Sequence, residues 1–377
     1  MNIIIAPDSF KGSISAPKLC SILKKGVLKV FPDANISEIP LADGGEGTLE
    51  NMVYASGGRV MMTSVQGPLQ KLVNASYGIL GDNETVIIEM AQASGLPLVS
   101  EREKNPLLAT SYGTGELIKH ALGEGYRKFV IGLGGSATND GGTGMLNALG
   151  VKFYDEIGQE LKNTLDVLSN LSFLDDSEID SRIQESSFTI ASDVENTLCG
   201  LEGASFVFGP QKGATPEMVE QLDEALYNFS EVVFKQKNIN MREIVGGGAA
   251  GGMGAALVTF LGAELKSGIE VVMDSINFEE IVQGVDLVIT GEGKLDSQTL
   301  SGKVIAGVTK ITNKYEIPVI ALCGGLDLNH SQLSKLGVLA GFSIVPGPCT
   351  LDSALENAPD WAEDRIVQIM SIVKQFS

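Results

Sequence analysis

Cysteine and histidine are scarce in this chain of 377 residues, and their scarcity excludes several kinds of site. The 4 cysteines lie far apart and form no C-x-x-C pair, so we expect neither a disulfide scaffold nor a cysteine-based zinc site. Such sparse cysteines favour a reducing, cytoplasmic environment. The 2 histidines, His120 and His330, suggest no Ser-His-Asp triad and no histidine metal cluster.

Basic residues are also few. The chain has 27 lysines and arginines against 47 aspartates and glutamates, which gives a net charge of −20. A nucleic-acid-binding protein needs a basic face, and an anionic membrane repels an acidic chain, so we expect neither nucleic acid nor membrane as a partner. The first ten residues have no basic segment and their apolar run ends at Pro7, which is unlike a signal peptide. The longest uncharged stretch includes residues 246–263, but seven of these are glycine, which predicts a loop leading into a buried helix.

Glycine, by contrast, is abundant: 45 of 377 residues, about 12%, against an average near 7%. Because 44% of the residues are apolar, we expect a folded chain whose extra glycines lie in tight turns and loops. At about 150 residues per domain, the length predicts two domains.

Both ends of the chain alternate strands with helices. Short apolar runs rich in β-branched residues alternate with segments of helical periodicity, which implies a doubly wound parallel α/β sheet. The last helix is expected from about Leu351. The predicted strands cover residues 2–5, 36–40, 286–290, 318–323 and 341–345.

The middle of the chain follows another pattern. Residues 60–65, 72–80 and 85–90 are extended runs with short connections, which force antiparallel pairing. Helices and strands resume afterwards, among them a long helix capped by Thr215 with Pro216 in its first turn. We therefore expect a discontinuous architecture, with one domain from residues 1–60 and 281–377 and an inserted mixed α/β domain from residues 61–280.

Charged residues follow three strands of the doubly wound domain. Ligands bind beyond the carboxyl ends of such strands, where carboxylates can hold Mg²⁺ and lysines can neutralise phosphate oxygens. The alternative is that these are ordinary surface turns, but three loops of this kind on one sheet edge favour phosphoryl transfer. The candidate residues are Asp8, Ser9 and Lys11 after the first strand, Asp43, Gly44 and Gly45 after the second, and Glu292, Lys294 and Asp296 after the strand that ends at Thr290.

The inserted region has a cluster of its own. A glycine-rich loop follows the strand over residues 129–133, and its backbone N–H groups can form an anion cradle at a helix start. Asp193, after another strand, is a candidate general base or alternatively a helix cap, and Lys212 is a phosphate contact or a solvated lysine. The candidates in the glycine-rich loop are Gly134, Gly135, Ser136, Asn139 and Asp140.

Short nucleotide-binding patterns leave one alternative open. A Walker A sequence is absent, which excludes a P-loop enzyme. G-x-G-x-x-A occurs at residues 132–137, with Asp155 about twenty residues further on, and G-x-G-x-x-G occurs at residues 246–251. A dehydrogenase therefore remains an alternative, although chance matches are expected in a chain so rich in glycine.

Longer strings give a more specific indication. They cover residues 6–13, 42–48, 134–142, 209–214, 246–254 and 290–299, and in this order they resemble those of bacterial glycerate kinases, type 1. One departure is Thr197, because the resemblance leads us to expect Asn-Pro where the chain has Asn196-Thr197, in the loop that carries Asp193.

The resemblance implies phosphorylation of D-glycerate with ATP and Mg²⁺, at the 2-hydroxyl rather than the 3-hydroxyl, to give 2-phosphoglycerate. This would place the enzyme in organic-acid and glyoxylate–glycerate catabolism feeding glycolysis. It also implies a flavodoxin-like domain interrupted by a restriction-endonuclease-like domain, with the active site in the cleft between them, and it allows a homo-oligomer. Besides the dehydrogenase, a non-catalytic protein that binds glycerate or a nucleotide is an alternative, and the clustered charges argue against it.

The expected roles follow from the chemistry of phosphoryl transfer. Asp193, Lys11 and Asp43 are expected to be catalytic, with Asp193 as the base for the attacking hydroxyl. Lys11 or Lys294 would hold the glycerate carboxylate, and Ser136, Asn139 and Lys212 would contact ATP phosphates. Mg²⁺ would be held by Asp43, Glu292 or Asp296.

Overall fold

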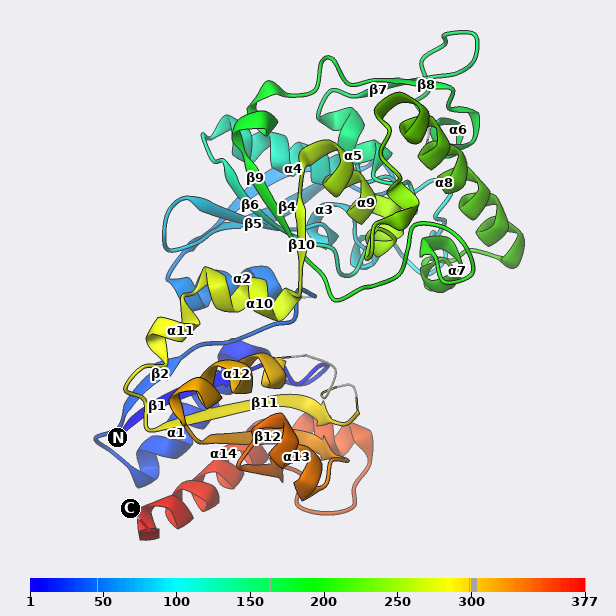
Figure 1. Ribbon diagram of the computed structural model, residues 1–377. Helices are drawn as coiled ribbons and strands as arrows, with labels where there is room; N and C mark the ends of the chain where they lie inside the picture. The colour runs from blue at the N-terminus through cyan, green and yellow to red at the C-terminus, as the bar shows by residue number, and fades with distance from the viewer. Residues whose placement is uncertain (46, 163, 298, 300–303, 377) are drawn as a thin grey trace. The chain divides into compact units, whose positions relative to one another are not determined.

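The computed structural model describes residues 1–45, 47–162, 164–297, 299 and 304–376 (Figure 1). The chain divides into two compact units that are both mixtures of helices and strands. Unit 1 comprises Met1–Asp43, Glu50–Gly57 and Val272–Ser377, and unit 2 comprises Gly44–Leu49 and Gly58–Val271. Both ends of the chain therefore belong to unit 1.

Unit 1 is built on a five-stranded, wholly parallel sheet in the order β13-β12-β11-β1-β2. Successive residues of a strand point to opposite faces, and in β12 Ile320 and Leu322 enter one apolar core while Ala321 and Cys323 enter another. Its strands are β1 (Asn2–Pro7), β2 (Asn35–Glu38), β11 (Leu287–Leu295), β12 (Val319–Leu326) and β13 (Ala340–Ser343).

Helices cover both faces of this sheet. The first core contains Leu19 of α1 and Ile366 of α14, and the second contains Ile305 of α12 and Leu333 of α13. This two-sided packing confirms the doubly wound parallel arrangement expected from the alternating pattern. The helices of unit 1 are α1 (Ala16–Val30), α11 (Phe278–Ile281), α12 (Val304–Thr312), η6 (Asn313–Tyr315), α13 (His330–Leu336) and α14 (Leu351–Phe376). Two helices, α2 (Thr48–Ser56) and α10 (Gly268–Ser275), carry the chain from one unit to the other.

Unit 2 contains a six-stranded mixed sheet in the order β10-β9-β6-β5-β4-β3. The pairs β3–β4 and β4–β5 are antiparallel, which confirms the pairing expected from the short connections, and the other pairs are parallel. The strands are β3 (Arg59–Gln66), β4 (Leu72–Ile79), β5 (Thr85–Glu89), β6 (Lys128–Gly132), β9 (Ser187–Ala191) and β10 (Glu264–Lys266), with β7 (Lys152–Tyr154) and β8 (Phe173–Asp175) forming a separate antiparallel pair.

The long helix of unit 2 begins where the sequence predicts. The Thr215 hydroxyl accepts a hydrogen bond from the Met218 amide at 3.3 Å, and Pro216 occupies the first turn of α8 (Pro216–Lys237). The other helices of unit 2 are α3 (Ala91–Ser94), η1 (Leu96–Leu98), α4 (Tyr112–Gly123), α5 (Thr143–Ala148), α6 (Thr164–Asn170), η2 (Ser181–Glu185), α7 (Ala204–Phe208), η3 (Pro210–Lys212), η4 (Met241–Glu243) and α9 (Ala249–Leu261). Among the described residues, no helix is both long enough and apolar enough to cross a membrane.

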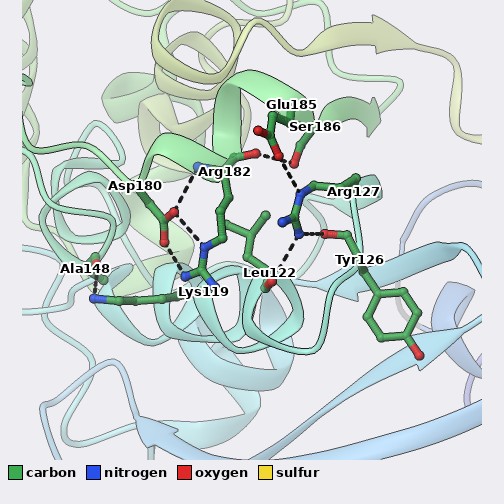
Figure 2. A network of polar contacts seen from close by, with 9 residues as sticks. All are labelled: Lys119, Leu122, Tyr126, Arg127, Ala148, Asp180, Arg182, Glu185 and Ser186. Atoms are coloured by element: carbon green, nitrogen blue, oxygen red, sulfur yellow. Dashed lines mark hydrogen bonds and ion pairs between the residues drawn. The ribbon is translucent and has the colours of Figure 1, made fainter.

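A polar network holds the start of β6 against α4 and η2 (Figure 2). The Arg127 guanidinium donates to the Leu122 carbonyl, in the last turn of α4, at 3.1 Å and to the Tyr126 carbonyl, just beyond that helix, at 2.8 Å. Arg182 makes two parallel bonds to Asp180, at 2.8 and 2.6 Å, which hold the pKa of that carboxyl below its usual range. The network fixes the entry to β6, the strand that leads into the glycine-rich loop.

One predicted boundary is wrong. The sequence predicts that a strand ends at Thr290 and a loop begins, but β11 continues to Leu295 with Glu292 opposite Cys323 and Lys294 opposite Gly325. In the sequence, the glycines that follow Thr290 predict a turn. Gly291 is instead required by close packing between strands, because a Cβ there would lie 2.3 Å from the Leu322 carbonyl oxygen. Glu292 and Lys294 are therefore strand residues.

Candidate active site

The carboxyl end of β1 places three predicted residues in a tight turn beside β11. The Asp8 amide donates to the Gly291 carbonyl at 2.8 Å, and the Asp8 carboxylate accepts the Ser9 amide at 2.6 Å. A Cβ on Gly293 would lie 3.6 Å from the Lys11 nitrogen, so the turn runs close to β11. Lys11 is exposed and able to meet a ligand.

The predicted carboxylates at the end of β11 are joined through a threonine that the sequence reasoning did not select. The Thr299 hydroxyl donates to the Glu292 carboxylate and accepts the Asp296 amide at 3.1 Å. Glu292 is 8% exposed and Thr299 1% exposed. The hydroxyl therefore fixes Glu292 relative to the Asp296 backbone.

Lys294 points to two carboxylates. Its ammonium lies 2.7 Å from Asp327 and 3.5 Å from Asp296. The hydrogen bond to Asp327, and then that to Asp296, raise the pKa of Lys294. Within the described part of the chain, no three His, Cys, Asp or Glu side chains gather closely enough to form a metal cage. A divalent cation held here by one or two carboxylates would take its other ligands from a phosphate group or water.

The second predicted loop divides between the units. The half-buried Asp43 is the last residue of the first segment of unit 1, and Gly44 and Gly45 belong to unit 2. Gly44 has a φ of +88°, and a Cβ there would lie 2.9 Å from the Ala191 carbonyl oxygen at the end of β9. A Cβ on Gly134 would lie 3.0 Å from the Gly45 Cα. The structure thus brings Gly44 and Gly45 together with Gly134 at the carboxyl ends of β6 and β9.

The glycine-rich loop after β6 has an outer and an inner part. Gly135 is exposed and Gly134 half-buried, whereas Ser136 is 6% exposed and Asn139 and Asp140 are fully buried. Only the outer part, Gly134 and Gly135, can therefore meet a ligand without rearrangement. The second part is the interior support of the loop.

Asp140 holds this support together. Its carboxylate accepts the Ser111 amide and hydroxyl, both at 2.7 Å, and the amides of Gly142 and Gly144 at 3.1 and 3.2 Å. Burial nevertheless raises the pKa of Asp140, because these bonds only partly offset the loss of water. Ser111 was not selected from the sequence, since a serine at a helix start carries no further signal.

Lys212 lies inside the unit rather than at its surface. It is 2% exposed and its ammonium donates to the Thr138 carbonyl at 2.6 Å. Burial lowers the pKa of Lys212 to about 7, against the raising effect of the Asp140 charge. Within the described residues, two nearby loop atoms, Thr138 Oγ1 and Asn139 Oδ1, are buried without a hydrogen-bond partner. Lys212 therefore braces the loop through a carbonyl, and the expectation of a solvated lysine is wrong.

The glycines of residues 246–254 support the same loop. Gly251 has a φ of +68°, and a Cβ there would lie 2.2 Å from the Thr138 carbonyl oxygen. The Gly251 carbonyl accepts the Gly141 amide at 2.9 Å. These residues are selected for close packing between two backbones.

Neither dinucleotide pattern has the strand–turn–helix context that it needs. After Ala137, α5 begins only at Thr143, and residues 246–251 follow η4 rather than a strand. In a dinucleotide-binding fold the glycine string itself leads from the strand into the helix. The dehydrogenase alternative therefore has no structural support in the described chain.

Asp193 follows β9 and is exposed. One of its carboxylate oxygens accepts the Gly268 amide at 3.0 Å, at the first residue of α10. This bond orients the carboxylate while leaving the residue accessible, so the helix-capping and base interpretations are compatible. Thr197, the departure noted above, donates its hydroxyl to the Cys199 carbonyl at 3.3 Å.

Comparisons with known proteins show the family to which the chain belongs. The sequence model described as "Glycerate kinase family" matches residues 3–374. Glycerate kinase of Bacillus subtilis is 46% identical, over 99% of this chain and 98% of that protein, and glycerate 2-kinase of Escherichia coli is 48% identical, over 96% and 94%. A crystal structure of a candidate glycerate kinase 2 from Salmonella typhimurium LT2 superimposes with a TM-score of 0.90 at 46% identity, covering 100% of this chain and 98% of that one. The chain belongs to the glycerate kinase family.

Proposed function

We propose that the protein is a glycerate kinase that transfers the γ-phosphoryl group of ATP to the 2-hydroxyl of D-glycerate, giving 2-phosphoglycerate and ADP. The observation that carries this proposal is the family match over residues 3–374, together with full-length relatives of which one is called glycerate 2-kinase. In the reaction the hydroxyl oxygen bonds to the γ-phosphorus, the bond to the β–γ bridging oxygen breaks, and the hydroxyl proton passes to a base.

Asp193 is the proposed base. An exposed carboxylate held by the Gly268 amide is oriented without being buried, which suits a group that must reach a substrate proton. Gly134 and Gly135 supply the outer part of the loop for the ATP phosphates, where backbone N–H groups bind anions, and the buried Ser136 belongs with the support behind it.

Asn139, Asp140 and Lys212 act from behind this surface. Because Asn139 and Asp140 are fully buried and Lys212 is 2% exposed, we assign them to holding the loop rather than to touching a phosphate. The rigid support keeps the amide groups oriented before the substrate arrives, which is how positioning lowers a barrier.

Unit 1 carries the remaining charged candidates. Lys11 is the better candidate for the glycerate carboxylate, since the Lys294 ammonium already lies 2.7 Å from Asp327. Asp8 and Ser9 shape the turn that carries Lys11. Asp43, Glu292 and Asp296 are the proposed ligands of Mg²⁺, which when bound with ATP neutralises charge on the phosphate oxygens.

The finer features implied by the resemblance belong to the same proposal. They are a flavodoxin-like topology for unit 1, a restriction-endonuclease-like topology for the inserted part, a cytoplasmic enzyme that can form a homo-oligomer, and a role in organic-acid catabolism feeding glycolysis. The parallel order β13-β12-β11-β1-β2 supports the first of these.

The test is ADP release from ATP with D-glycerate and Mg²⁺, with phosphorus NMR of the product. We expect release only when D-glycerate and Mg²⁺ are both present, and a product signal from 2-phosphoglycerate. L-Glycerate and tartronate serve as alternative acceptors. A folded protein that releases no ADP with any of the three would contradict the proposal, and a 3-phosphoglycerate signal would correct the position of transfer.

A further inference from the structure

A buried carboxylate that the proposed mechanism does not use lies at the end of β5. Glu89 is the last residue of that strand and is 5% exposed. It pairs in parallel register with Gly132, so it stands at the same sheet edge as the glycine-rich loop. Charged residues are seldom fully buried unless they are paired.

Glu89 holds the beginning of α2. Its Oε1 accepts the Leu49 amide at 2.7 Å, and Leu49 is the second residue of that helix. The first amides of a helix have no hydrogen-bond partner within the helix, and the positive end of the helix dipole at that terminus attracts a carboxylate. Since Leu49 is 1% exposed, water is not at hand to satisfy this amide in place of Glu89.

A neighbouring contact reaches the loop of Gly44 and Gly45, two of the candidate binding residues selected from the sequence. The Thr48 hydroxyl donates to the Gly45 carbonyl at 2.7 Å, one residue before Leu49. The missing side chain at Gly132 leaves room on this edge, because a Cβ there would lie 3.3 Å from the Gly44 carbonyl oxygen and 3.6 Å from Glu89 Cγ. Glu89, Gly44 and Gly132 are therefore packed together.

We propose that Glu89 is a positioning residue that fixes Gly44 and Gly45 against the carboxyl ends of β6 and β9. It acts through Leu49 and Thr48, and it touches neither glycerate nor ATP. The inference rests on the proposed function for its effect on activity, but the holding of the segment can be measured independently.

The kinetic test compares three variants. Glu89→Ala removes the acceptor, Glu89→Asp keeps the charge but draws the carboxylate back by one methylene, and Glu89→Gln keeps an acceptor oxygen at full reach. In Glu89→Ala and Glu89→Asp we expect the KM for D-glycerate or ATP to rise about tenfold while kcat changes less than about threefold. In Glu89→Gln we expect the KM to stay within about twofold of the wild-type value. If Ala fails to fold, the contrast between Asp and Gln carries the test.

The matched control is Glu116→Ala. Glu116 also accepts a backbone amide in unit 2, that of Gln66 at 2.6 Å, but it belongs to α4 and has no part in the proposed site. The Glu116→Ala substitution should lower thermal stability without raising the KM for D-glycerate or the KM for ATP. Equal KM values in Glu89→Ala and Glu116→Ala, or a Gln variant as impaired as Asp, would overturn the proposal.

Amide hydrogen exchange followed by mass spectrometry separates this inference from the proposed function. Exchange at Thr48 and Leu49 should be faster in Glu89→Ala than in the wild type and in Glu116→Ala. Unchanged exchange would overturn the role of Glu89 even in an active enzyme. If the wild type does not phosphorylate glycerate but exchange responds as expected, the substrate assignment fails and the positioning role stands.

Discussion

Lys212 gives the clearest pH dependence among the individual side chains. Its pKa is lowered from 10.5 to about 7 by burial, so between these pH values the unfolded chain holds a proton that the folded chain has lost. The free energy of unfolding then rises with pH in this window, by at most about 1.4 kcal/mol per pH unit for one proton. We expect this contribution to be absent in Lys212→Met.

The measurement is urea unfolding at pH 7, 8 and 9 for the wild type and Lys212→Met. Asp140, whose charge opposes the shift, is present in both, and the remaining titrating groups cancel in the difference. Equal slopes against pH for the two proteins would show that the ammonium keeps its proton in the folded state.

Asp193→Asn tests the base. Asparagine keeps an oxygen that can accept the Gly268 amide, so the start of α10 should survive and the melting temperature should change little. Because a general base contributes about 10²- to 10⁴-fold, kcat should fall by that order while the KM values change little. Steady-state kinetics with a calorimetric scan provide both readings.

Asp223→Asn is the matched control for this substitution. Its carboxylate also accepts a backbone amide, that of Gly200 at 3.0 Å, but it lies on α8 and outside the proposed site. It should keep near-normal turnover. An Asp193→Asn enzyme as active as Asp223→Asn would remove Asp193 from the role of base.

Among the helices and strands, α9 depends on close packing between backbones. At Gly251 an alanine Cβ would lie 2.2 Å from the Thr138 carbonyl oxygen, in a backbone with positive φ. At Gly262, at the other end of the helix, φ is also positive, but no described atom lies within 4 Å of the Cβ position. Gly262→Ala should therefore cost about 1 kcal/mol of unfolding free energy, and Gly251→Ala about 3 kcal/mol or more.

Chemical denaturation of the two alanine variants measures the difference. The Gly251 variant should also lose kinase activity at temperatures where it remains folded, because the clash pushes on the loop that carries Ser136. Similar losses of stability in both variants would mean that φ alone explains the glycine at position 251.

The elements that the sequence predicts well are those with local signals. Thr215 and Pro216 marked the start of α8, and short connections required the antiparallel pairs of β3, β4 and β5. Ser15 lies at the N-cap position of α1, where serine is a favoured residue, yet within the described chain its side chain makes no capping bond. The length of β11 was missed because glycine signals a turn and a close backbone approach equally well, and only the partner strand distinguishes them.

The candidate site shows the same limit. The exposed Lys11 and Asp193 could be selected because each follows a strand end. Burial of Lys212 could not be read from the sequence, since a lysine is ordinarily exposed. Glu89 carries a sequence signal, because a lone carboxylate ends the apolar run of β5, but this signal lies in the last residue of a strand rather than in the loop after it.

In the molecule as a whole, the chain passes between the two units at four places, after residues 43, 49, 57 and 271. The first of the two segments that enter unit 2 is short and comprises only Gly44–Leu49. The sequence of this segment contains no apolar pattern that would indicate to which unit's core it belongs. Among the described residues, the contacts that hold it there include the hydrogen bond of Glu89 with Leu49 and the close approaches of Gly44 and Gly45.

The net charge of −20 gives the last prediction, because both proposed substrates are anions. The field of an acidic protein opposes the approach of glycerate and ATP, and salt screens it beyond a Debye length of about 10 Å at 0.1 M. Raising NaCl from about 10 to 150 mM at fixed Mg²⁺ should therefore increase kcat/KM for D-glycerate by about two- to threefold. A basic enzyme acting on the same substrates would lose activity over this range.

Melting temperatures in the same buffers control for changes in stability, and kcat at saturating substrate should vary much less than kcat/KM, since screening acts on the encounter. A steady fall in kcat/KM with salt would instead mean that Lys11 and its neighbours dominate the field that a substrate meets. In that case Lys11→Ala should abolish the salt dependence. The sign of the change in kcat/KM with salt therefore distinguishes attraction by a few lysines from repulsion by the acidic surface.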